Sequence, residues 1–172
     1  MTAVQARGVM PPASPAPLQA ASPRPQPLVV VGASGNVGTS AVAWMLDAHD
    51  AGTWRTDVLS PLPTPDVLVT GVPLQAMTRA SNALLLLSRL GIRPALVVVD
   101  DGHGRPPPDS RALLILMRPV TRAVLRMPYV PAWRASTSPG GLTPPTGPAL
   151  KAANRLRAAF GLAPMPSPKR TR

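Results

Sequence analysis

The sequence predicts an α/β protein, a three-layer sandwich built on a small parallel sheet of about four strands, P-loop-like or Rossmann-like in plan. Short runs rich in β-branched residues alternate with segments of helical apolar spacing, as in parallel sheets joined by helical crossovers. A glycine-punctuated turn follows the first such run. The chain has 172 residues, and its 25 prolines and 13 glycines are unevenly spread. We therefore expect an ordered centre of roughly 100 residues, enough to fold alone, between Pro-rich ends.

The first half of the ordered centre begins after a leader, residues 1–27, that holds seven prolines and reads as disordered or polyproline-like. Residues 28–31, Leu-Val-Val-Val, are typical of a buried strand. After the glycine turn, residues 39–49 are expected to form a helix with Val42 and Leu46 on its packing side. Residues 50–65, with three prolines towards the end, are expected to form a loop.

The second half repeats the strand–helix alternation. Residues 66–71 and 94–99 are expected strands, and between them Pro73 suits the first turn of a helix that ends near Leu90. Asp109 or Ser110 is expected to N-cap a short helix that reaches Met117 and is stopped by Pro119. A further strand is expected over residues 123–127, and a basic helix over 149–160. The resulting domain plan is leader 1–27, α/β domain 28–134, linker 135–148, and basic helix with tail 149–172.

The charge of the chain is concentrated near its C-terminus. The formal net charge is +11, yet residues 110–172 alone carry eleven Lys or Arg and no acid. Such a segment suits nucleic acid, an anionic membrane surface or an acidic protein partner. A contact with nucleic acid would be to its backbone and salt-sensitive, since no base-reading motif is visible. A merely solvated basic end is the alternative. The contact residues expected on this basis are Lys151, Arg155, Arg157, Lys169, Arg170 and Arg172.

Composition excludes several classes of site. Without cysteine, the chain has no disulfide, Cys-ligated metal or thiol nucleophile, and one Phe and one Tyr do not make a stacking platform for single strands. No apolar run reaches the roughly 18 residues of a membrane span, and prolines interrupt the region where a signal peptide would need its apolar core. A cytoplasmic protein is expected.

The glycine turn is the strongest functional signal. Gly32, Gly35 and Gly38 follow a strand and open a helix, the context in which backbone N–H groups and the helix dipole hold a phosphate. The alternative is that these glycines only permit tight packing of strand and helix. The expected nucleotide-binding residues are Gly32, Gly35, Asn36, Val37, Gly38, Thr39 and Ser40.

One interpretation of this turn is a small Rossmann-like NAD(P)-binding module, because the glycine spacing resembles the cofactor loop of short-chain and extended dehydrogenases. That interpretation needs a second strand ending in an acid or Arg about 20 residues on, to hold the adenosine ribose. Asp57 is the candidate for this acid, but it lies in a Pro-rich loop and not after a clear strand. The chain has no Tyr-x-x-x-Lys pair, since its only Tyr, Tyr129, is followed four residues later by Trp133. Only cofactor binding would remain.

The leading interpretation covers more of the chain. Residues 35–40, Gly-Asn-Val-Gly-Thr-Ser, resemble the deviant Walker A loop of MinD/ParA-type (SIMIBI) ATPases. Residues 66–73 and 92–99 look like that family's later strand–helix–strand segment. The whole of 28–134 resembles small, mostly uncharacterised actinobacterial relatives with an Asp-x-x-Gly-Arg stretch and a Pro-Tyr-Val-x-x-Trp-Arg ending, here at 101–105 and 128–134. The resemblance implies ATP with Mg²⁺ as ligand, and a role in DNA partition, transfer or a mobile element.

Departures from that family argue against hydrolysis. Thr39 and Ser34 stand where the family has its lysines, so neither supplies the cation that phosphoryl transfer requires. Ser40 survives as a magnesium ligand. About 16 residues separate the loop helix from Asp66, too few for the strand and switch loops that bring the Walker B aspartate. We therefore expect weak nucleotide binding or none, without turnover, in a protein that acts through contacts with other proteins or with DNA.

Two further features stay open. Asp100 and Asp101 follow an expected strand, where a carboxylate could hold Mg²⁺ near Ser40, although a solvated, glycine-rich strand exit is the favoured explanation and no metal site is predicted. His103 has no nucleophile or orienting partner that would make it a general base. The third functional class is a basic, non-enzymatic interaction domain whose glycine loop binds nothing.

Overall fold

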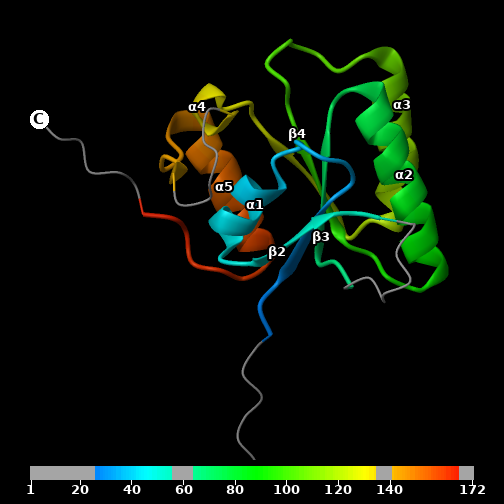
Figure 1. The fold of residues 1–172 in the computed structure, drawn as a ribbon, viewed down its shortest axis with the longest axis horizontal. Helices are drawn as coiled ribbons and strands as arrows, with labels where there is room; N and C mark the ends of the chain where they lie inside the picture. The colour runs from blue at the N-terminus through cyan, green and yellow to red at the C-terminus, as the bar shows by residue number, and fades with distance from the viewer. Residues whose placement is uncertain (1–25, 56–63, 135–140, 167–172) are drawn as a thin grey trace, which may run out of the picture.

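One parallel sheet of five strands forms the centre of the molecule. The computed structural model describes residues 26–55, 64–134 and 141–166, and the strands lie in the order β2-β1-β3-β4-β5 (Figure 1). Helices cover both faces, so the predicted three-layer α/β sandwich is confirmed, with five strands in place of about four. The strands are β1 (Val29–Gly32), β2 (His49–Thr53), β3 (Val67–Gly71), β4 (Ala95–Val99) and β5 (Ala123–Met127).

The alternation of side chains along the strands builds a core on each face of the sheet. Val30 and Val67 point to the face covered by α1 (Thr39–Leu46) and α5 (Gly147–Ala159). Their neighbours Val31 and Leu68 point to the face covered by α2 (Leu74–Arg89) and α3 (Pro108–Met117). Figure 1 shows these two helix pairs on opposite sides of the sheet. Burial on both faces explains why the central strands read as continuous apolar runs.

The strand that the sequence did not predict is β2. Residues 50–65 were expected to form a loop, but His49–Thr53 pairs in parallel with β1, with Val29 opposite His49 and Gly32 opposite Thr53. The prediction was wrong because this strand, His-Asp-Ala-Gly-Thr, is polar and lies at the sheet edge. It is held by backbone pairing with one neighbour, such as the hydrogen bond from the His49 N–H to the Leu28 carbonyl at 2.7 Å.

Two helix ends also differ from the prediction. The first helix was expected to reach His49 but ends at Leu46, because Asp47 adopts a left-handed conformation with φ of 52° and turns the chain into β2. The short helix α3 begins at Pro108 after Pro107, with no side-chain cap, so neither Asp109 nor Ser110 is its N-cap. A proline is favourable there because a first-turn N–H has no intrahelical acceptor. The helix does end before Pro119, in the 3-10 turn η1 (Arg118–Val120).

The segment after β5 returns to the sheet. A short helix, α4 (Pro131–Arg134), follows the last strand, and α5 then packs against α1 and β5 with Ala153 and Leu156 buried in the core. The sequence analysis set this helix apart from the α/β domain; in the structure its apolar side completes one of the two cores. Most of the leader (1–25), residues 56–63 and 135–140, and the end of the tail (167–172) lie outside the described residues.

Within the described residues, no helix combines the length and hydropathy that crossing a membrane requires.

Candidate functional site

A cleft of about 820 Å³ opens at the carboxyl edge of the sheet. The chain leaves β1 towards α1 on one face and leaves the adjacent β3 towards α2 on the other, so the strand order reverses direction between these two strands. Open α/β sheets bind their ligands in the crevice at this switch point. The cleft extends from residues of β2 to the segment after β5, and it contains the glycine loop.

The glycine loop approaches the cleft with its backbone. Gly32 lies beneath the loop, where a Cβ atom would come within 2.2 Å of Thr39 Oγ1 and 3.0 Å of the Ser34 carbonyl oxygen. Asn36 and Gly38 adopt left-handed conformations, with φ of 59° and 88°. The predicted residues from Gly35 to Ser40 all line the cleft, whereas Gly32 does not.

The first turn of α1 provides the hydrogen-bond donors of this loop. The helix starts at Thr39 after Gly38, and no side chain caps it. The N–H groups of a first helical turn have no acceptor within the helix, and the helix dipole places partial positive charge there. An uncapped first turn preceded by a glycine loop is suited to an anion such as phosphate.

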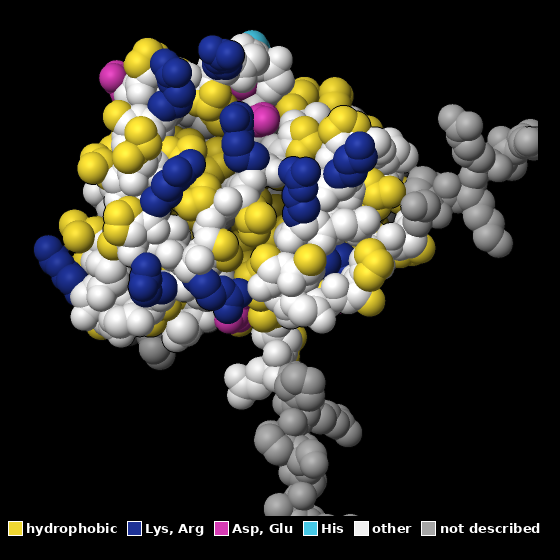
Figure 2. Space-filling model, turned by 180° about the vertical axis from the view of Figure 1, so that it is seen from behind, with side chains coloured by type: hydrophobic (Ala, Val, Ile, Leu, Met, Phe, Trp, Pro, Cys, Tyr) yellow, Lys and Arg dark blue, Asp and Glu magenta, His cyan; other side chains and the backbone are white. Residues whose placement is uncertain are grey.

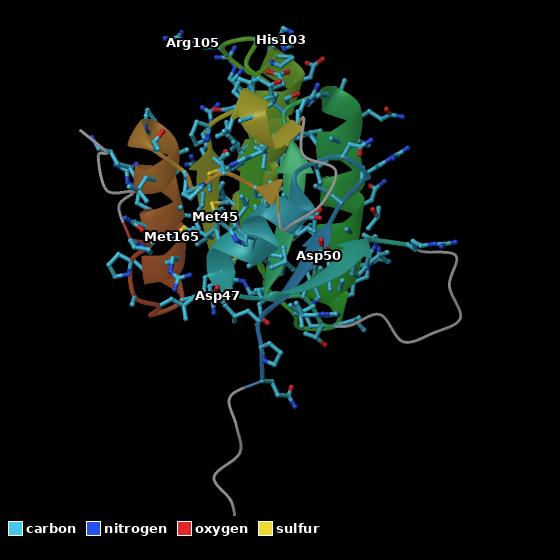
Figure 3. All side chains as sticks on the ribbon, turned by 60° about the vertical axis from the view of Figure 1, so that its left-hand side comes forward. Met45, Asp47, Asp50, His103, Arg105 and Met165 are labelled. Atoms are coloured by element: carbon cyan, nitrogen blue, oxygen red, sulfur yellow. The ribbon has the colours of Figure 1, made fainter. Side chains whose placement is uncertain are left out.

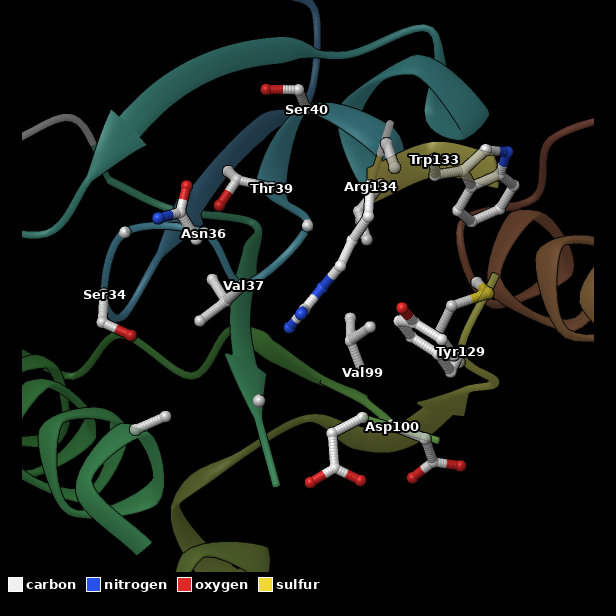
Figure 4. Close-up of a pocket in the computed structure, with 18 of the residues that line it drawn as sticks. Ser34, Asn36, Val37, Thr39, Ser40, Val99, Asp100, Tyr129, Trp133 and Arg134 are labelled. Atoms are coloured by element: carbon white, nitrogen blue, oxygen red, sulfur yellow. The ribbon is translucent and has the colours of Figure 1, made fainter. Parts of the chain in front are cut away.

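Arg134 supplies the cation that the loop itself lacks. Its side chain lines the cleft, and Figure 4 shows it running from α4 towards the glycine loop, with the guanidinium group between Val37 and Val99. The Arg134 Cζ atom is 5.6 Å from the centre of the Tyr129 ring. Among the described residues, no carboxylate lies within ion-pair distance of this guanidinium. A positive charge without a carboxylate partner therefore faces the start of α1.

The polar residues proposed as magnesium ligands are separated. Ser40 Oγ donates a hydrogen bond of 2.6 Å to Asp50 Oδ2 on β2, while Asp100 accepts from Arg126 Nη2 at 2.5 Å. Figure 4 places Ser40 and Asp100 at opposite sides of the cleft. A magnesium ion shared by these two residues is therefore not supported by their positions, and Asp50 is the carboxylate beside Ser40. Asp50 also accepts the Gly52 N–H at 2.9 Å, which keeps it at the cleft.

The strand exit after β4 is an exposed turn that lies against Tyr129. The Asp101 carboxylate accepts the backbone N–H of His103 at 2.9 Å, and the His103 side chain is 87% exposed, pointing away from the body at the top of Figure 3. Gly102 has a φ of 83°, and a Cβ atom there would lie 2.8 Å from Tyr129 Cδ1. The turn thus supports the Tyr129 ring, which lines the cleft.

The far wall of the cleft is apolar. It is formed after β4 and β5, where Trp133 packs against the core and its Nε1 donates to the Thr143 carbonyl at 2.9 Å. This bond fixes α4, and with it Arg134. The cleft therefore combines an apolar wall with a few polar groups at the glycine loop, which is the usual make-up of a small-molecule site. The side chains of this wall are Val99, Met127, Tyr129, Val130, Trp133 and Leu142.

The predicted basic contact residues do not act as one set. Lys151 and Arg155 are exposed on α5. Arg157, in contrast, is directed inward: its Nη1 donates to the Met45 carbonyl at 2.6 Å, and its side chain is 13% exposed. Lys169, Arg170 and Arg172 lie outside the described residues.

Sequence reasoning missed Arg134 and Asp50 as cleft residues. A signal for Arg134 existed, because it follows the last strand closely and the carboxyl ends of parallel strands meet at one edge of the sheet. For Asp50 the signal was absent, since it lies on the strand that the sequence did not reveal.

Comparisons with protein-family models, curated proteins and solved structures found no match.

Proposed function

We propose that this protein binds a nucleotide-type ligand through its phosphates at the glycine loop and holds it without hydrolysis. The observation that carries the proposal is the position of Arg134, whose guanidinium faces the uncapped first turn of α1 across the cleft. A planar guanidinium pairs with phosphate oxygens through two parallel hydrogen bonds. Donors from the loop and a cation from α4 would then enclose one phosphate group.

Binding without turnover follows from the residues of the loop. Thr39 and Ser34 stand where MinD/ParA-type loops carry the lysines that neutralise transferring phosphoryl charge, and one arginine positions a phosphate without activating water. The resemblance to MinD/ParA-type proteins, and with it a role in DNA partition, transfer or a mobile element, stays a prediction. The cleft supports the ligand class alone.

A second candidate, an NAD(P)-binding module, is favoured by β2. The dinucleotide reading requires a second strand beside the first, ending near an acid or Arg about 20 residues after the loop. Strand β2 pairs in parallel with β1, and Arg55 follows it closely. An arginine at this point suits the 2′-phosphate of NADP. The cleft also extends from Asp50 on β2 to Tyr129 beyond β5, a span suited to two nucleosides.

Thermal-shift titrations of the full chain with ATP and Mg²⁺, ADP, NAD and NADP test the proposal. A ligand at a hundredfold excess over its dissociation constant stabilises the folded state by about 2.7 kcal/mol, which raises Tm measurably. We expect a shift with at least one of these ligands. A response to ATP that needs Mg²⁺ selects the triphosphate, and a response to NADP or NAD selects the dinucleotide.

The matched variants are Arg134→Gln and Arg105→Gln. Arg105 is exposed in the loop after β4 and does not line the cleft. Loss of a charged hydrogen bond to phosphate costs about 1.5–3 kcal/mol, so Arg134→Gln should weaken binding by about tenfold or more, while Arg105→Gln leaves it unchanged. No shift with any ligand, or equal weakening by both variants, would contradict the proposal.

A further inference from the structure

A basic surface surrounds the sheet edge opposite β2. The last strand, β5, pairs with β4 on one side only, so its other side is a sheet edge. Figure 1 is seen from the β2 side, and Figure 2, turned by 180°, therefore views the molecule from the β5 side. Figure 2 shows Lys and Arg side chains spread over this whole face, with few acidic side chains among them.

The residues of this face come from separate elements. We use the term β5 face for the exposed basic side chains of η1, β5, α5 and the residues flanking the strands. No Asp or Glu occurs between residues 110 and 172. The acidic neighbour of this group is Asp100, which pairs with Arg126. The members of the β5 face are Arg93, Arg118, Arg122, Arg126, Lys151 and Arg155.

Two of these arginines line one small hollow at the amino edge of the sheet, away from the cleft. Arg93 and Arg122 line it together with Thr121. Arg93 is held by hydrogen bonds from Nη2 to the carbonyls of Pro119 at 2.5 Å and Thr121 at 3.4 Å. The Arg122 Cζ atom lies 4.5 Å from the centre of the Phe160 ring.

These contacts fix both guanidinium groups without neutralising either. Carbonyl oxygens and a ring face accept a cation but carry no full negative charge, and no described carboxylate lies within ion-pair distance of Arg93 or Arg122. Two cations beside one hollow repel each other, and an anion between them would remove that cost. The hollow therefore has the charge arrangement of a phosphate-binding site.

The other basic residues continue the positive charge from this hollow across the β5 face. Arg122 and Arg126 are four residues apart along extended chain, which separates their Cα atoms by about 13 Å. Lys151 and Arg155 are one helical turn apart on α5, which packs against β5. Cations distributed at such intervals suit a ligand that repeats its negative charge, and arginine forks match phosphate oxygens.

We propose that the β5 face binds the phosphate backbone of nucleic acid, with a phosphate seated between Arg93 and Arg122. A membrane surface fits less well, because interfacial binding inserts large apolar side chains. The exposed large apolar residues of the described chain lie on α2, beside its end and on α3, and η1, β5 and α5 contribute none. The proposal is independent of the cleft and requires no nucleotide there.

Fluorescence anisotropy with a labelled duplex of about 25 base pairs, measured on the full chain from 50 to 200 mM salt, tests this proposal. Arg118→Gln/Arg122→Gln should weaken binding by tenfold or more at 100 mM salt, and each lost phosphate contact should reduce the slope of log K against log salt by about 0.9. The matched control, Arg89→Gln/Arg105→Gln, removes the same charge outside the β5 face and should bind like the wild type.

A second variant keeps the test valid if loss of the Arg122 contact to Phe160 unfolds the chain. Arg118→Gln/Lys151→Gln removes two charges whose side chains make no hydrogen bond or ion pair to a described residue, and it should lose affinity without losing Tm. Equal losses in the control would indicate attraction by net charge alone and overturn the proposal. Absence of duplex binding by the wild type would also overturn it. The proposal would fail as well if these variants weakened binding to anionic vesicles or poly-aspartate but left duplex binding unaffected.

Discussion

Arg157 of α5 donates a hydrogen bond of 2.6 Å from Nη1 to the carbonyl oxygen of Met45, near the C-terminal end of α1, joining residues 112 positions apart. The same group donates to Asp47 Oδ2 at 2.9 Å, and Nε donates to the Ala163 carbonyl. A cation at this helix end also complements the helix dipole. Figure 3 shows Met45 and Asp47 beside the last helix. Arg157 thus joins α5 to the C-terminal end of α1, the neighbouring helix on the same face of the sheet.

We expect Arg157→Ala to lower the free energy of unfolding by about 1.5–3 kcal/mol, because a hydrogen bond to a charged group contributes about that much and the bond to the Met45 carbonyl is partly buried. Urea denaturation measures the change. Arg155→Ala, two residues away on the exposed side of the same helix, should cost less than about 0.5 kcal/mol. Equal losses in the two variants would show that Arg157 is as solvated as Arg155.

Leu156→Ala tests whether α5 is integral to the core. Its side chain is 1% exposed within the cluster that also contains Val30 and Leu46. Removing a buried leucine costs about 2–5 kcal/mol through lost transfer free energy and the cavity left behind. We expect such a loss in urea denaturation, in one cooperative transition. Leu90→Ala, at a site 72% exposed, should change stability little. A separate early transition for α5 would contradict this assignment.

Gly32→Ala should destabilise the strand–loop junction. The new Cβ would lie 2.2 Å from Thr39 Oγ1; rotation of Thr39 relieves that contact but leaves the Ser34 carbonyl oxygen at 3.0 Å. Overpacking of this kind costs about 1–3 kcal/mol. Gly35→Ala is the matched control, since a Cβ there meets nothing within 4 Å. Equal Tm values for the two variants in thermal denaturation would show that the loop backbone can shift around residue 32 at no cost in stability.

The limits of sequence reasoning follow from how each element is stabilised. Strands such as β4 and β5 were predicted within one residue because their β-branched and apolar side chains encode burial. The edge strand β2 carries no such pattern, since backbone pairing with β1 forms it. The left-handed turn at Asp47 likewise has no pattern in the local sequence that predicts it. Both are set by partners elsewhere in the fold, which local propensity does not contain.

The candidate site divides in the same way. The glycine loop was predicted because its strand, turn and helix are contiguous in the sequence, and because the spacing of the glycines indicates a tight turn of the backbone between them. Arg134 reaches the cleft through tertiary contacts, among them the bond from Trp133 to Thr143, and no local motif marks it. Asp47 and Arg157 illustrate the reverse error, since a basic residue that looked available for a partner is already used within the fold.

Arg55 should determine the choice between dinucleotides if the cleft holds one. An arginine after the second strand accommodates the 2′-phosphate that distinguishes NADP from NAD. We expect Arg55→Ser to weaken NADP binding by about tenfold or more, with little change for NAD, as measured by calorimetric titration. Arg89→Ser, at the distal end of α2, should leave both affinities unchanged. An equal loss for both dinucleotides would place Arg55 away from the 2′ position.

Gly102 and Gly104 permit a matched test of the Tyr129 wall. Both have left-handed conformations, with φ of 83° and 92°, so alanine at either position carries a similar backbone cost of about 1–2 kcal/mol. Only at Gly102 would the new Cβ meet the Tyr129 ring, at 2.8 Å from Cδ1; at Gly104 it meets nothing within 4 Å. Gly102→Ala must therefore displace the ring that lies beside Arg134. We expect both variants to lose Tm, and Gly102→Ala alone to change the affinity for the cleft ligand in the titrations above. Equal affinities in the two variants would mean that Tyr129 does not shape the ligand site.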